Sequence, residues 1–315
     1  MYSRLKIFTG NSNPKLAHEV AKIAGIPLGD VEVFKFSNDN TFVKLNENVR
    51  GADTFIVQPT SRPVNDNVME LLIMVDALRR SSAQRITCVM PYFGYARSDK
   101  KDQNGVPITA KLIANLLSTA GADRVIAMDL HSDQIQGFFD IPVDHLYSMP
   151  IFSRYFQANL DLTNSVVVSP DTGGTARARA LAQRLKCSLA IGDKRRSGND
   201  GNAEILNIIG DVKGKTAIIY DDIIDSGGSL TKMANVLQKN GAAKVYAACC
   251  HGVLSGKAIS NLENSPIEKL FISNSVPLSS ESAKCNKIVQ LSIAELMAFA
   301  IKKIHIEESL STLFR

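Results

Sequence analysis

Residues 216–230 read Thr-Ala-Ile-Ile-Tyr-Asp-Asp-Ile-Ile-Asp-Ser-Gly-Gly-Ser-Leu. The apolar run Thr216–Tyr220 predicts a buried strand, which the carboxylates of Asp221 and Asp222 follow directly. Asp225–Ser229 then predicts a turn at the start of a helix, where small residues allow a nest of backbone N–H groups. This order predicts an α/β sheet that delivers polar groups to its edge.

The same turn offers donors to a phosphate. Its backbone can come close to an anion, and hydroxyls add to the N–H groups, at Ser226, Gly227, Gly228 and Ser229. The two carboxylates before the turn would repel a phosphate, so we expect them to face ribose hydroxyls or a cation. A capped helix with Asp225 or Ser226 as N-cap is the simpler alternative, but it leaves the two further acids unexplained. The segment is predicted to hold a phosphorylated ribose.

Composition and charge limit the class of protein. The 315 residues suffice for two domains of ordinary size, and 45% are hydrophobic, with a mean hydropathy of -0.01. No run approaches the roughly 18 apolar residues of a membrane helix. The net charge of +5 suits phosphorylated small molecules. Nucleic acid is a poorer expectation, because basic residues are scattered and Trp is absent.

The cysteines indicate a compartment. They are odd in number and lie mostly in or beside apolar runs: Cys88, Cys187, Cys249, Cys250 and Cys285. This pattern predicts free thiols in a reducing environment, with a metal or redox site at Cys249-Cys250 as the alternative. The polar opening lacks a signal-peptide pattern, so we expect a cytoplasmic location.

Short apolar runs alternate with amphipathic stretches along the whole chain, which predicts parallel sheets covered on both faces by helices. The expected strands are Leu5–Thr9, Val31–Phe36, Thr54–Gln58, Ile86–Pro91, Val125–Asp129, Ser165–Ser169, Ser188–Gly192, Thr216–Tyr220, Val245–Cys250, Lys269–Ile272 and Lys287–Leu291. The expected helices are Pro14–Ala24, Asn67–Ser81, Ile108–Ala120, Thr175–Leu185, Leu230–Asn240 and Ile293–Ile304.

The pattern occurs twice. Leu5–Ala24 and Val166–Leu185 each read as strand, polar loop and helix, and each half later has a strand that ends in acid. We therefore predict an α/β fold of two similar domains, residues 1–147 and 148–315, each a mainly parallel sheet flanked by helices. Ligands of such sheets bind beyond the carboxyl ends of the strands.

Two segments of the first half follow strands at such an edge. Arg97, in the loop after Ile86–Pro91, is able to clamp a polyphosphate, although a basic loop is usually only a solvated surface. Asp129 and His131 end the next strand, and this pair can hold Mg²⁺ together with waters and phosphate oxygens. A structural role is the alternative for His131.

Together these motifs resemble class I ribose-phosphate pyrophosphokinases. The most specific match is Asp129–Tyr147, with Asp-Leu-His, Gln-Ile-Gln-Gly-Phe-Phe-Asp-Ile-Pro-Val-Asp and Leu-Tyr. The turn at Asp221–Ser229 resembles the ribose-phosphate loop of the phosphoribosyltransferase fold. The resemblance extends over essentially the whole chain, through Asn48–Gly51, Pro63–Ala77, Pro91–Asp102, Ser169–Arg179, Asp193–Arg196 and Glu307–Phe314.

The resemblance implies an enzyme that transfers the β,γ-diphosphoryl group of MgATP to the C1 hydroxyl of ribose 5-phosphate, giving phosphoribosyl pyrophosphate and AMP. It implies Mg²⁺ both as MgATP and as a second, free ion. ATP would bind in the first of two phosphoribosyltransferase-like domains, and ribose 5-phosphate in the second. By resemblance, Lys194 is the catalytic lysine and Arg196 its partner beside the ribose phosphate. The small polar residues 197–202 are expected to form a mobile loop that closes over the substrates.

The resemblance also assigns ligand residues. Those for ribose 5-phosphate are Arg196, Asp221, Asp222, Asp225, Ser226, Gly227, Gly228 and Ser229, and those for metal are His131 and Asp171, beside Asp129. Those for ATP are Phe36, Asn38, Asn40, Arg97, Ser98, Asp102 and His131. Two residues depart from the family: Asn40 stands where an acid is usual, and Ser98 where glutamine is usual. Both changes are expected to weaken contacts with ATP.

Regulation and assembly are implied by the resemblance alone. Segments similar to those around the family's phosphate or ADP regulatory site contain Arg50, Ser82, Ser132, Gln136, Ser309 and Ser311, and a surface or capping role is the alternative for each. The family implies a homo-oligomer, by default a hexamer, in which the Phe36 segment reaches a neighbouring subunit's site.

Two other functions stay open. The changes at Asn40 and Ser98 are compatible with a catalytically weakened homologue that acts as the regulatory subunit of an active synthetase. A phosphoribosyltransferase, or a regulator that senses phosphoribosyl groups, would not need Asp129–His131 and fits less well. The partners of the leading prediction are ATP and ribose 5-phosphate, with neither nucleic acid nor a membrane.

Overall fold

The structure, a computed structural model, describes residues 4–196 and 203–314, with only the backbone described at 194–196, 203–206 and 314. The chain divides into two compact units. Unit 1 comprises residues 1–147, 275–277 and 292–315, and unit 2 comprises residues 148–274 and 278–291. Residues 292–315, which the sequence assigned to the second domain, thus belong with the first, because the C-terminal helix packs there.

Unit 1 is built on a parallel sheet. In the described chain this sheet has five strands in the order β1-β4-β5-β6-β7. Its elements are β1 (Leu5–Thr9), α1 (Pro14–Ala24), β4 (Asp53–Val57), α2 (Val64–Arg80), β5 (Arg85–Met90), α3 (Thr109–Ala120), β6 (Arg124–Met128), the 3-10 helix η1 (Asp133–Phe138), β7 (Val143–Leu146), α8 (Ala294–His305) and the 3-10 helix η3 (Leu310–Phe314).

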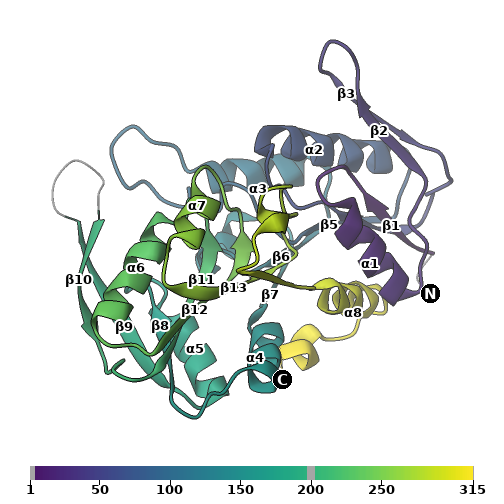
Figure 1. Cartoon of the computed structure of the whole chain (residues 1–315). Coiled ribbons are helices and arrows are strands. Elements are labelled where there is room, and N and C mark those ends of the chain that lie inside the picture. Colours follow the sequence, from purple (N-terminus) through teal and green to yellow (C-terminus); the bar gives the residue numbers. More distant parts are fainter. Residues whose placement is uncertain (1–3, 197–202, 315) are drawn as a thin grey trace. The chain divides into compact units, whose positions relative to one another are not determined.

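Both faces of this sheet are buried. On one face Phe8, Ile56 and Met90 pack with α2 and α3 in a single apolar cluster. Residues of the opposite parity, such as Ile7 and Val89, are also fully buried. Figure 1 shows α8 lying beside α1, and the two helices contact each other. Such two-sided cover is what continuous apolar strands require.

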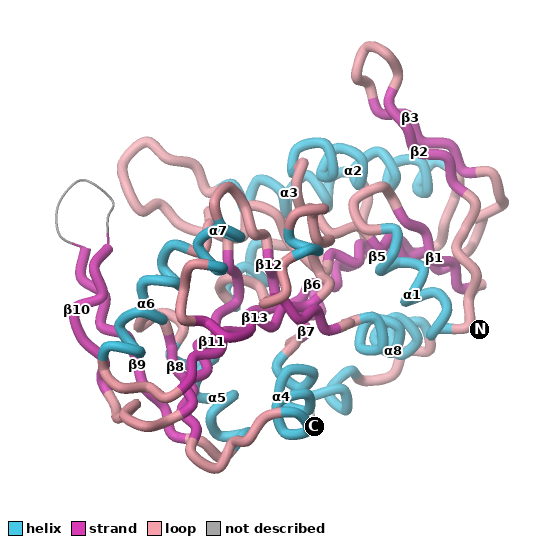
Figure 2. The backbone as a smooth tube through the Cα atoms, in the orientation of Figure 1, coloured by secondary structure: helices cyan, strands magenta, loops and turns pink. Residues whose placement is uncertain are grey.

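One predicted strand of unit 1 lies outside the parallel sheet. β2 (Val31–Lys35) pairs with β3 (Thr41–Leu45) in an antiparallel hairpin, drawn as a pair of magenta tube segments in Figure 2. The chain reverses because Phe36 N–H donates to Asn40 O over 2.9 Å and Asp39 takes a left-handed φ of 67°. The prediction of a parallel strand was wrong here, since the turn chemistry of residues 36–40 was missed.

Unit 2 has the larger sheet. Among the described residues it has seven strands in the order β10-β9-β8-β11-β12-β13-β14, all parallel except β10 against β9. Its elements are α4 (Met149–Asn159), β8 (Ser165–Ser169), α5 (Thr175–Leu185), β9 (Ser188–Arg196), β10 (Ala203–Ile209), β11 (Thr216–Ile224), α6 (Gly228–Lys239), β12 (Lys244–Gly252), α7 (Ala258–Glu263), β13 (Ile267–Ser273), the 3-10 helix η2 (Ser282–Lys284) and β14 (Ile288–Leu291).

Helices cover both faces of this sheet as well. α4 and α5 pack against Val167, Ile218 and Phe271, whereas α6 and α7 pack against residues of the other parity, such as Ile219 and Ala247. The predicted α/β class, with mainly parallel sheets flanked by helices, is confirmed. None of the described helices is long and apolar enough to cross a membrane, and none of the five cysteines, all in the described residues, forms a disulfide.

Some elements differ from prediction. The short helices α4 and α7 and the strands β3, β7 and β10 were not predicted. β11 extends to Ile224, because its ladder with β12 continues through Asp221↔Cys249 and Ile223↔His251. The two acids therefore lie within the strand, beyond its last pairing with β8 at Ile219↔Val168.

The C-terminal helix is tied to unit 1 through Asp53. This carboxylate, 1% exposed, accepts from Arg85 Nε over 2.8 Å, and His305 Nδ1 lies 2.7 Å from its second oxygen. Arg85 also donates to Ile304 O over 3.1 Å. The start of β4 and the last turn of α8 thus share one buried polar cluster.

Asp53→Ala should destabilise the protein strongly, because it removes the buried carboxylate that Arg85 and His305 both contact. We expect a loss of about 3 kcal/mol in the free energy of unfolding, measured by urea denaturation. Asp76→Ala is the matched control, since Asp76 pairs with Arg80 on the exposed face of α2 and its loss should change little. Equal effects of the two substitutions would contradict this assignment.

Candidate active site

The turn after β11 presents unpaired donors. In the described part of the chain, the backbone N–H groups of residues 226–229 donate to no acceptor. They stand at the N-terminus of α6, where the helix dipole is positive. Gly227 has a φ of 73°, a left-handed conformation that favours glycine. Such an arrangement binds an anion, and phosphate fits it.

The acid pair lies directly before this turn on β11. Asp222 is 3% exposed, and its Oδ1 lies 3.0 Å from Arg177 Nη1. The same guanidinium nitrogen lies 3.4 Å from Asp221 Oδ1. Burial first, and then the charge of Asp222, raise the pKa of Asp221 well above its ordinary value. Two carboxylates that share one cation provide acceptors for hydroxyls or a further cation.

Sequence reasoning missed Arg177. It lies in the first turn of α5, on the helix that follows the loop Asp171-Thr172-Gly173-Gly174. A basic residue in the first turn of a helix gains nothing from the helix dipole. That mismatch was the available signal.

The loop before α5 brings Asp171 to the same edge. Asp171 Oδ1 accepts from Gly174 N–H over 3.1 Å, and Ser169 Oγ donates to Asp171 O over 2.6 Å. A Cβ added at Gly174 would lie 3.9 Å from both Asp171 Oδ1 and Asp221 Oδ1, so the two carboxylates border one small space. Asp171, the acid pair and the turn are thus gathered at the carboxyl edge of the unit 2 sheet.

Lys194 and Arg196 belong to β9, beyond its pairing with β8. Their backbones pair with β10 at Lys194↔Ile205 and Arg196↔Ala203. The predicted closing loop, residues 197–202, lies outside the described residues. The segment Asp193–Arg196 is therefore one arm of an antiparallel extension at the edge of the unit 2 sheet.

In unit 1, Asp129 and His131 follow β6. Asp129 is 4% exposed with a φ of 38°, and its N–H donates to Leu146 O over 3.0 Å. His131 is exposed. Between them, Leu130 N–H donates over 2.9 Å to Nε2 of His145, whose side chain is 3% exposed. This strained turn holds the acid inward and the histidine outward at the sheet edge.

The loop after β5 carries Arg97, Ser98 and Asp102. Its base is fixed to the end of β4, since Gly94 N–H donates to Thr60 Oγ1 over 2.7 Å. Arg97 and Asp102 are exposed and Ser98 is half-buried. The loop thus leaves the same carboxyl edge as Asp129, as the parallel order of β4, β5 and β6 requires.

The predicted adenine residues stand at the tip of the β2–β3 hairpin. Phe36 is 49% exposed and contacts two further aromatic rings, Phe34 and Phe42, at centroid distances of 5.2 and 5.4 Å. Asn38 and Asn40 are exposed in the turn. Lys35 ties the tip to α2 through Asp66 at 2.9 Å.

The proposed regulatory residues form three local groups in unit 1. Arg50 lies next to Ser82, since Gly51 N–H donates to Ser82 O over 2.8 Å. Ser132 is the N-cap of η1 and Gln136 lies within that helix, and Ser309 and Ser311 bond to each other over 3.0 Å. In the described chain no hydrogen bond joins one group to another.

The carboxylate oxygens at these strand ends are ligands that suit a hard cation such as Mg²⁺. No cluster of three or more His, Cys, Asp or Glu side chains able to hold a metal occurs among the described residues. Mg²⁺ usually needs only one or two carboxylates, with waters and phosphate oxygens as the other ligands. The space bordered by Asp171 and Asp221 meets that requirement.

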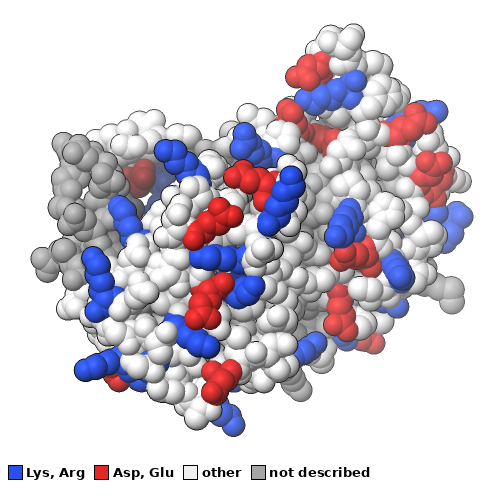
Figure 3. All heavy atoms as spheres, in the orientation of Figure 1, with Lys and Arg blue, Asp and Glu red and all other residues white. Residues whose placement is uncertain are grey.

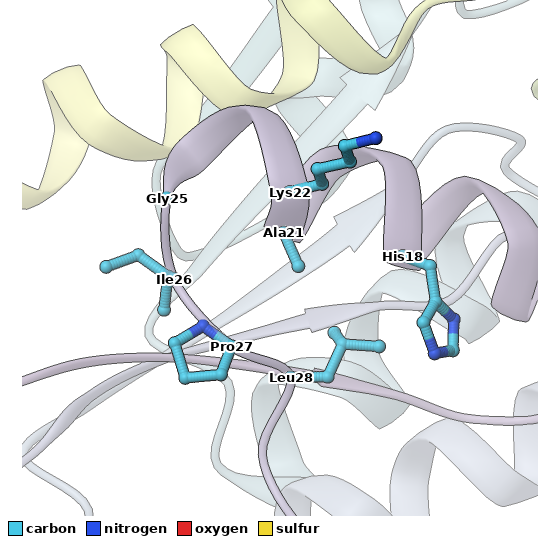
Figure 4. A pocket seen from close by; sticks show the side chains of 7 residues that line it. All are labelled: His18, Ala21, Lys22, Gly25, Ile26, Pro27 and Leu28. Atoms are coloured by element: carbon cyan, nitrogen blue, oxygen red, sulfur yellow. The ribbon is translucent and has the colours of Figure 1, made fainter.

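Other surfaces are less informative. On the face drawn in Figure 3, basic and acidic side chains are interspersed on each unit, without a continuous basic stripe. A hollow of about 410 Å³ on unit 1 is lined by His18, Ala21, Lys22, Gly25, Ile26, Pro27 and Leu28 (Figure 4). It contains no acid and lies at the C-terminal end of α1, so it is not part of the strand-end edge.

Asp221→Asn should stabilise the ligand-free protein. Unfolded Asp221 ionises near 3.8 and the folded group only at higher pH, so the unfolded state binds fewer protons and stability falls as pH rises through this window. The variant should have a higher urea midpoint near pH 8 and a weaker pH dependence from about pH 4 upward.

Asp211→Asn is the control for this prediction. The pKa of Asp211 is lowered, first by the backbone N–H of Lys213 and then by Lys215, so removing its charge should not stabilise. An Asp221→Asn protein that is less stable than the parent across this range would contradict the assignment.

Comparison with known proteins identifies the family. The family model of the N-terminal domain of ribose phosphate pyrophosphokinase matches residues 5–121, and that of the phosphoribosyl synthetase-associated domain matches residues 201–315. The ribose-phosphate pyrophosphokinase of Bacillus subtilis (strain 168) is 54% identical over 98% of this chain and 97% of that protein. The Nitrosomonas europaea enzyme of the same name is 50% identical over 99% of both chains.

A solved structure agrees. The phosphoribosylpyrophosphate synthetase from Mycobacterium smegmatis superposes with a TM-score of 0.91 at 40% identity, over 97% of this chain and 100% of that chain. With sequence models, full-length relatives and a solved structure in accord, the chain belongs to the ribose-phosphate pyrophosphokinase family.

Proposed function

We propose that the protein transfers the β,γ-diphosphoryl group of ATP to the C1 hydroxyl of ribose 5-phosphate, giving phosphoribosyl pyrophosphate and AMP. The observation that carries this proposal is the end of β11, where Asp221 and Asp222 precede a turn whose N–H groups, at residues 226–229, have no acceptor in the described chain. The family's relatives, similar over their whole length, support it.

In unit 2 the sugar phosphate would lie across the end of β11. The turn at residues 226–229 would bind the 5-phosphate, because its N–H groups and the dipole of α6 favour an anion. Asp221 and Asp222 would accept from the ribose hydroxyls. Arg177 keeps the pair from repelling the phosphate by neutralising part of its charge.

In unit 1 the nucleotide would bind at the carboxyl edge. Arg97 is suited to the phosphates, Phe36 to stacking on adenine, and Asn38, Asn40, Ser98 and Asp102 to polar contacts. Asp129 and His131 in unit 1, and Asp171 in unit 2, would hold Mg²⁺ in MgATP and as a second ion. Bound there, Mg²⁺ would neutralise charge on the phosphates and increase the nucleophilicity of the C1 hydroxyl.

Lys194 and Arg196 would supply the positive charge that the transition state needs. Charge builds on the oxygens of the transferred β-phosphorus and on the phosphate of the departing AMP, and cations placed beforehand stabilise it. No protein nucleophile is required for direct transfer. Both residues lie on β9, beyond its last pairing with β8, and this position supports these roles.

The wider context follows the family resemblance. We propose a homo-oligomer, by default a hexamer, in a cytoplasmic location. Phosphate and ADP are the proposed effectors, through Arg50, Ser82, Ser132, Gln136, Ser309 and Ser311. Sedimentation velocity with and without phosphate tests the assembly.

A direct assay tests the reaction. Purified protein with Mg²⁺ and ATP should release AMP only when ribose 5-phosphate is present, in equal amount to phosphoribosyl pyrophosphate. AMP that appears without the sugar phosphate, or ADP in place of AMP, would contradict the proposal. Failure of all turnover would favour the regulatory-subunit alternative.

Lys194→Ala should lower kcat by at least about 100-fold with little change in ribose 5-phosphate binding, as expected for a contact made only in the transition state. Steady-state kinetics with calorimetric binding measures both quantities. Lys239→Ala, on the exposed last turn of α6, is the control and should leave both unchanged. A kcat within about threefold of the parent would show that Lys194 is not the catalytic lysine.

A further inference from the structure

The segment after β12 contacts the phosphate turn residue by residue. We call residues 253–261 the clasp; it runs from the end of β12 into the short helix α7. Nothing in its sequence suggests a ligand. The fold, and not any local sequence pattern, brings it beside residues 224–227.

Hydrogen bonds join the clasp to three successive residues. Ile224 O accepts from the N–H groups of Val253 and Leu254, over 2.9 and 3.2 Å. Ser255 binds Asp225 twice, since its N–H donates to Asp225 O over 3.1 Å and its hydroxyl donates to the carboxylate oxygen Oδ1. These bonds fix both the backbone and the side chain of the residue that opens the turn.

The next two residues are held as well. Asn261 Nδ2 donates to Ser226 O over 3.0 Å. Gly227 packs on α7, where a Cβ added to the glycine would lie 3.6 Å from Ala258 Cα. Four successive residues of the strand end and turn are therefore fixed by one segment.

The clasp itself is strained where it meets the turn. Leu254 has a φ of 50°, in the left-handed region that a side chain of its size disfavours. Such a conformation costs on the order of 1–3 kcal/mol and persists only where its surroundings impose it. The strain lies directly before Ser255, the residue with two bonds to Asp225.

These contacts share one consequence. They occupy the acceptors of the turn, namely the carbonyls of Asp225 and Ser226 and one oxygen of the Asp225 carboxylate. The donors of residues 226–229 stay without an acceptor in the described chain. An anion at the turn therefore meets N–H groups, while these three acceptor atoms already accept hydrogen bonds from the clasp.

We propose that Ser255 and Asn261 are positioning residues that hold the turn in its anion-binding geometry before ribose 5-phosphate arrives. The proposal rests on the proposed function, and neither side chain is assigned a contact with substrate. Preorganisation of this kind raises affinity by reducing the conformational entropy lost on binding.

Kinetics of two variants tests the clasp. Ser255→Ala and Asn261→Ala should each raise KM for ribose 5-phosphate about 10-fold, with kcat and KM for ATP within about twofold, because uniform binding of the remote phosphate is lost. Ser255→Thr retains the hydroxyl and should have the same KM for ribose 5-phosphate as the parent protein. Asn264→Ala is the matched control, since Asn264, the C-cap of α7, uses Nδ2 to bond only to Ser260 among the residues that the structure describes.

An unchanged KM for ribose 5-phosphate, an equal rise in KM for ATP, or a Ser255→Thr protein as weak as Ser255→Ala would overturn the proposal. Calorimetric titration with ribose 5-phosphate separates it from the proposed function. A parent protein that binds the sugar phosphate but releases no AMP contradicts the function alone. The clasp is then judged by whether the two variants lose about 10-fold in affinity.

Discussion

At the end of β11, two carboxylates are followed within a few residues by N–H groups that favour an anion. Asp221, whose pKa is raised by burial and by the charge of Asp222, and Asp222 itself precede four N–H groups that have no acceptor in the described residues. Arg177 balances part of the acid charge. A sugar phosphate satisfies both the acids and the N–H groups, since its hydroxyls donate to the acids and its phosphate accepts from the turn. The site therefore gives up stability without ligand in exchange for recognition.

In unit 1 the corresponding loop, after β1, is filled by a side chain of the protein itself. After β1, Asn11 N–H donates to Glu70 Oε1 over 2.6 Å, and Asn11 Nδ2 donates to Glu70 Oε2 over 2.8 Å. A Cβ on Gly10 would lie 2.2 Å from Glu70 Oε1. Unit 1 thus fills its own strand-end loop with an internal carboxylate, whereas the loop at Asp171–Gly174 of unit 2 borders the space next to Asp221. The repeated strand-loop-helix pattern produced one closed loop and one available for ligand.

Local chemistry explains which features the sequence could predict. Pro14–Ala24 was predicted to the residue because Asn13, Pro14 and Gly25 mark both ends of the helix. The turn at Asp225–Ser229 was predictable because its glycines and hydroxyls are contiguous. The contacts of Arg177 and of the clasp were not predictable, since Arg177 meets the acid pair across 44 and 45 residues and Ser255 meets Asp225 across 30. The docking of α8 on Asp53 spans 252 residues and has no local signal.

A crystal structure with ribose 5-phosphate tests the central claim most directly. The account predicts the 5-phosphate oxygens within hydrogen-bond distance of the N–H groups of residues 226–229, with ribose hydroxyls toward Asp221 and Asp222. The turn should superpose on its ligand-free form, because the clasp already fixes it. A phosphate bound elsewhere, or a turn that rearranges to receive it, would contradict the account.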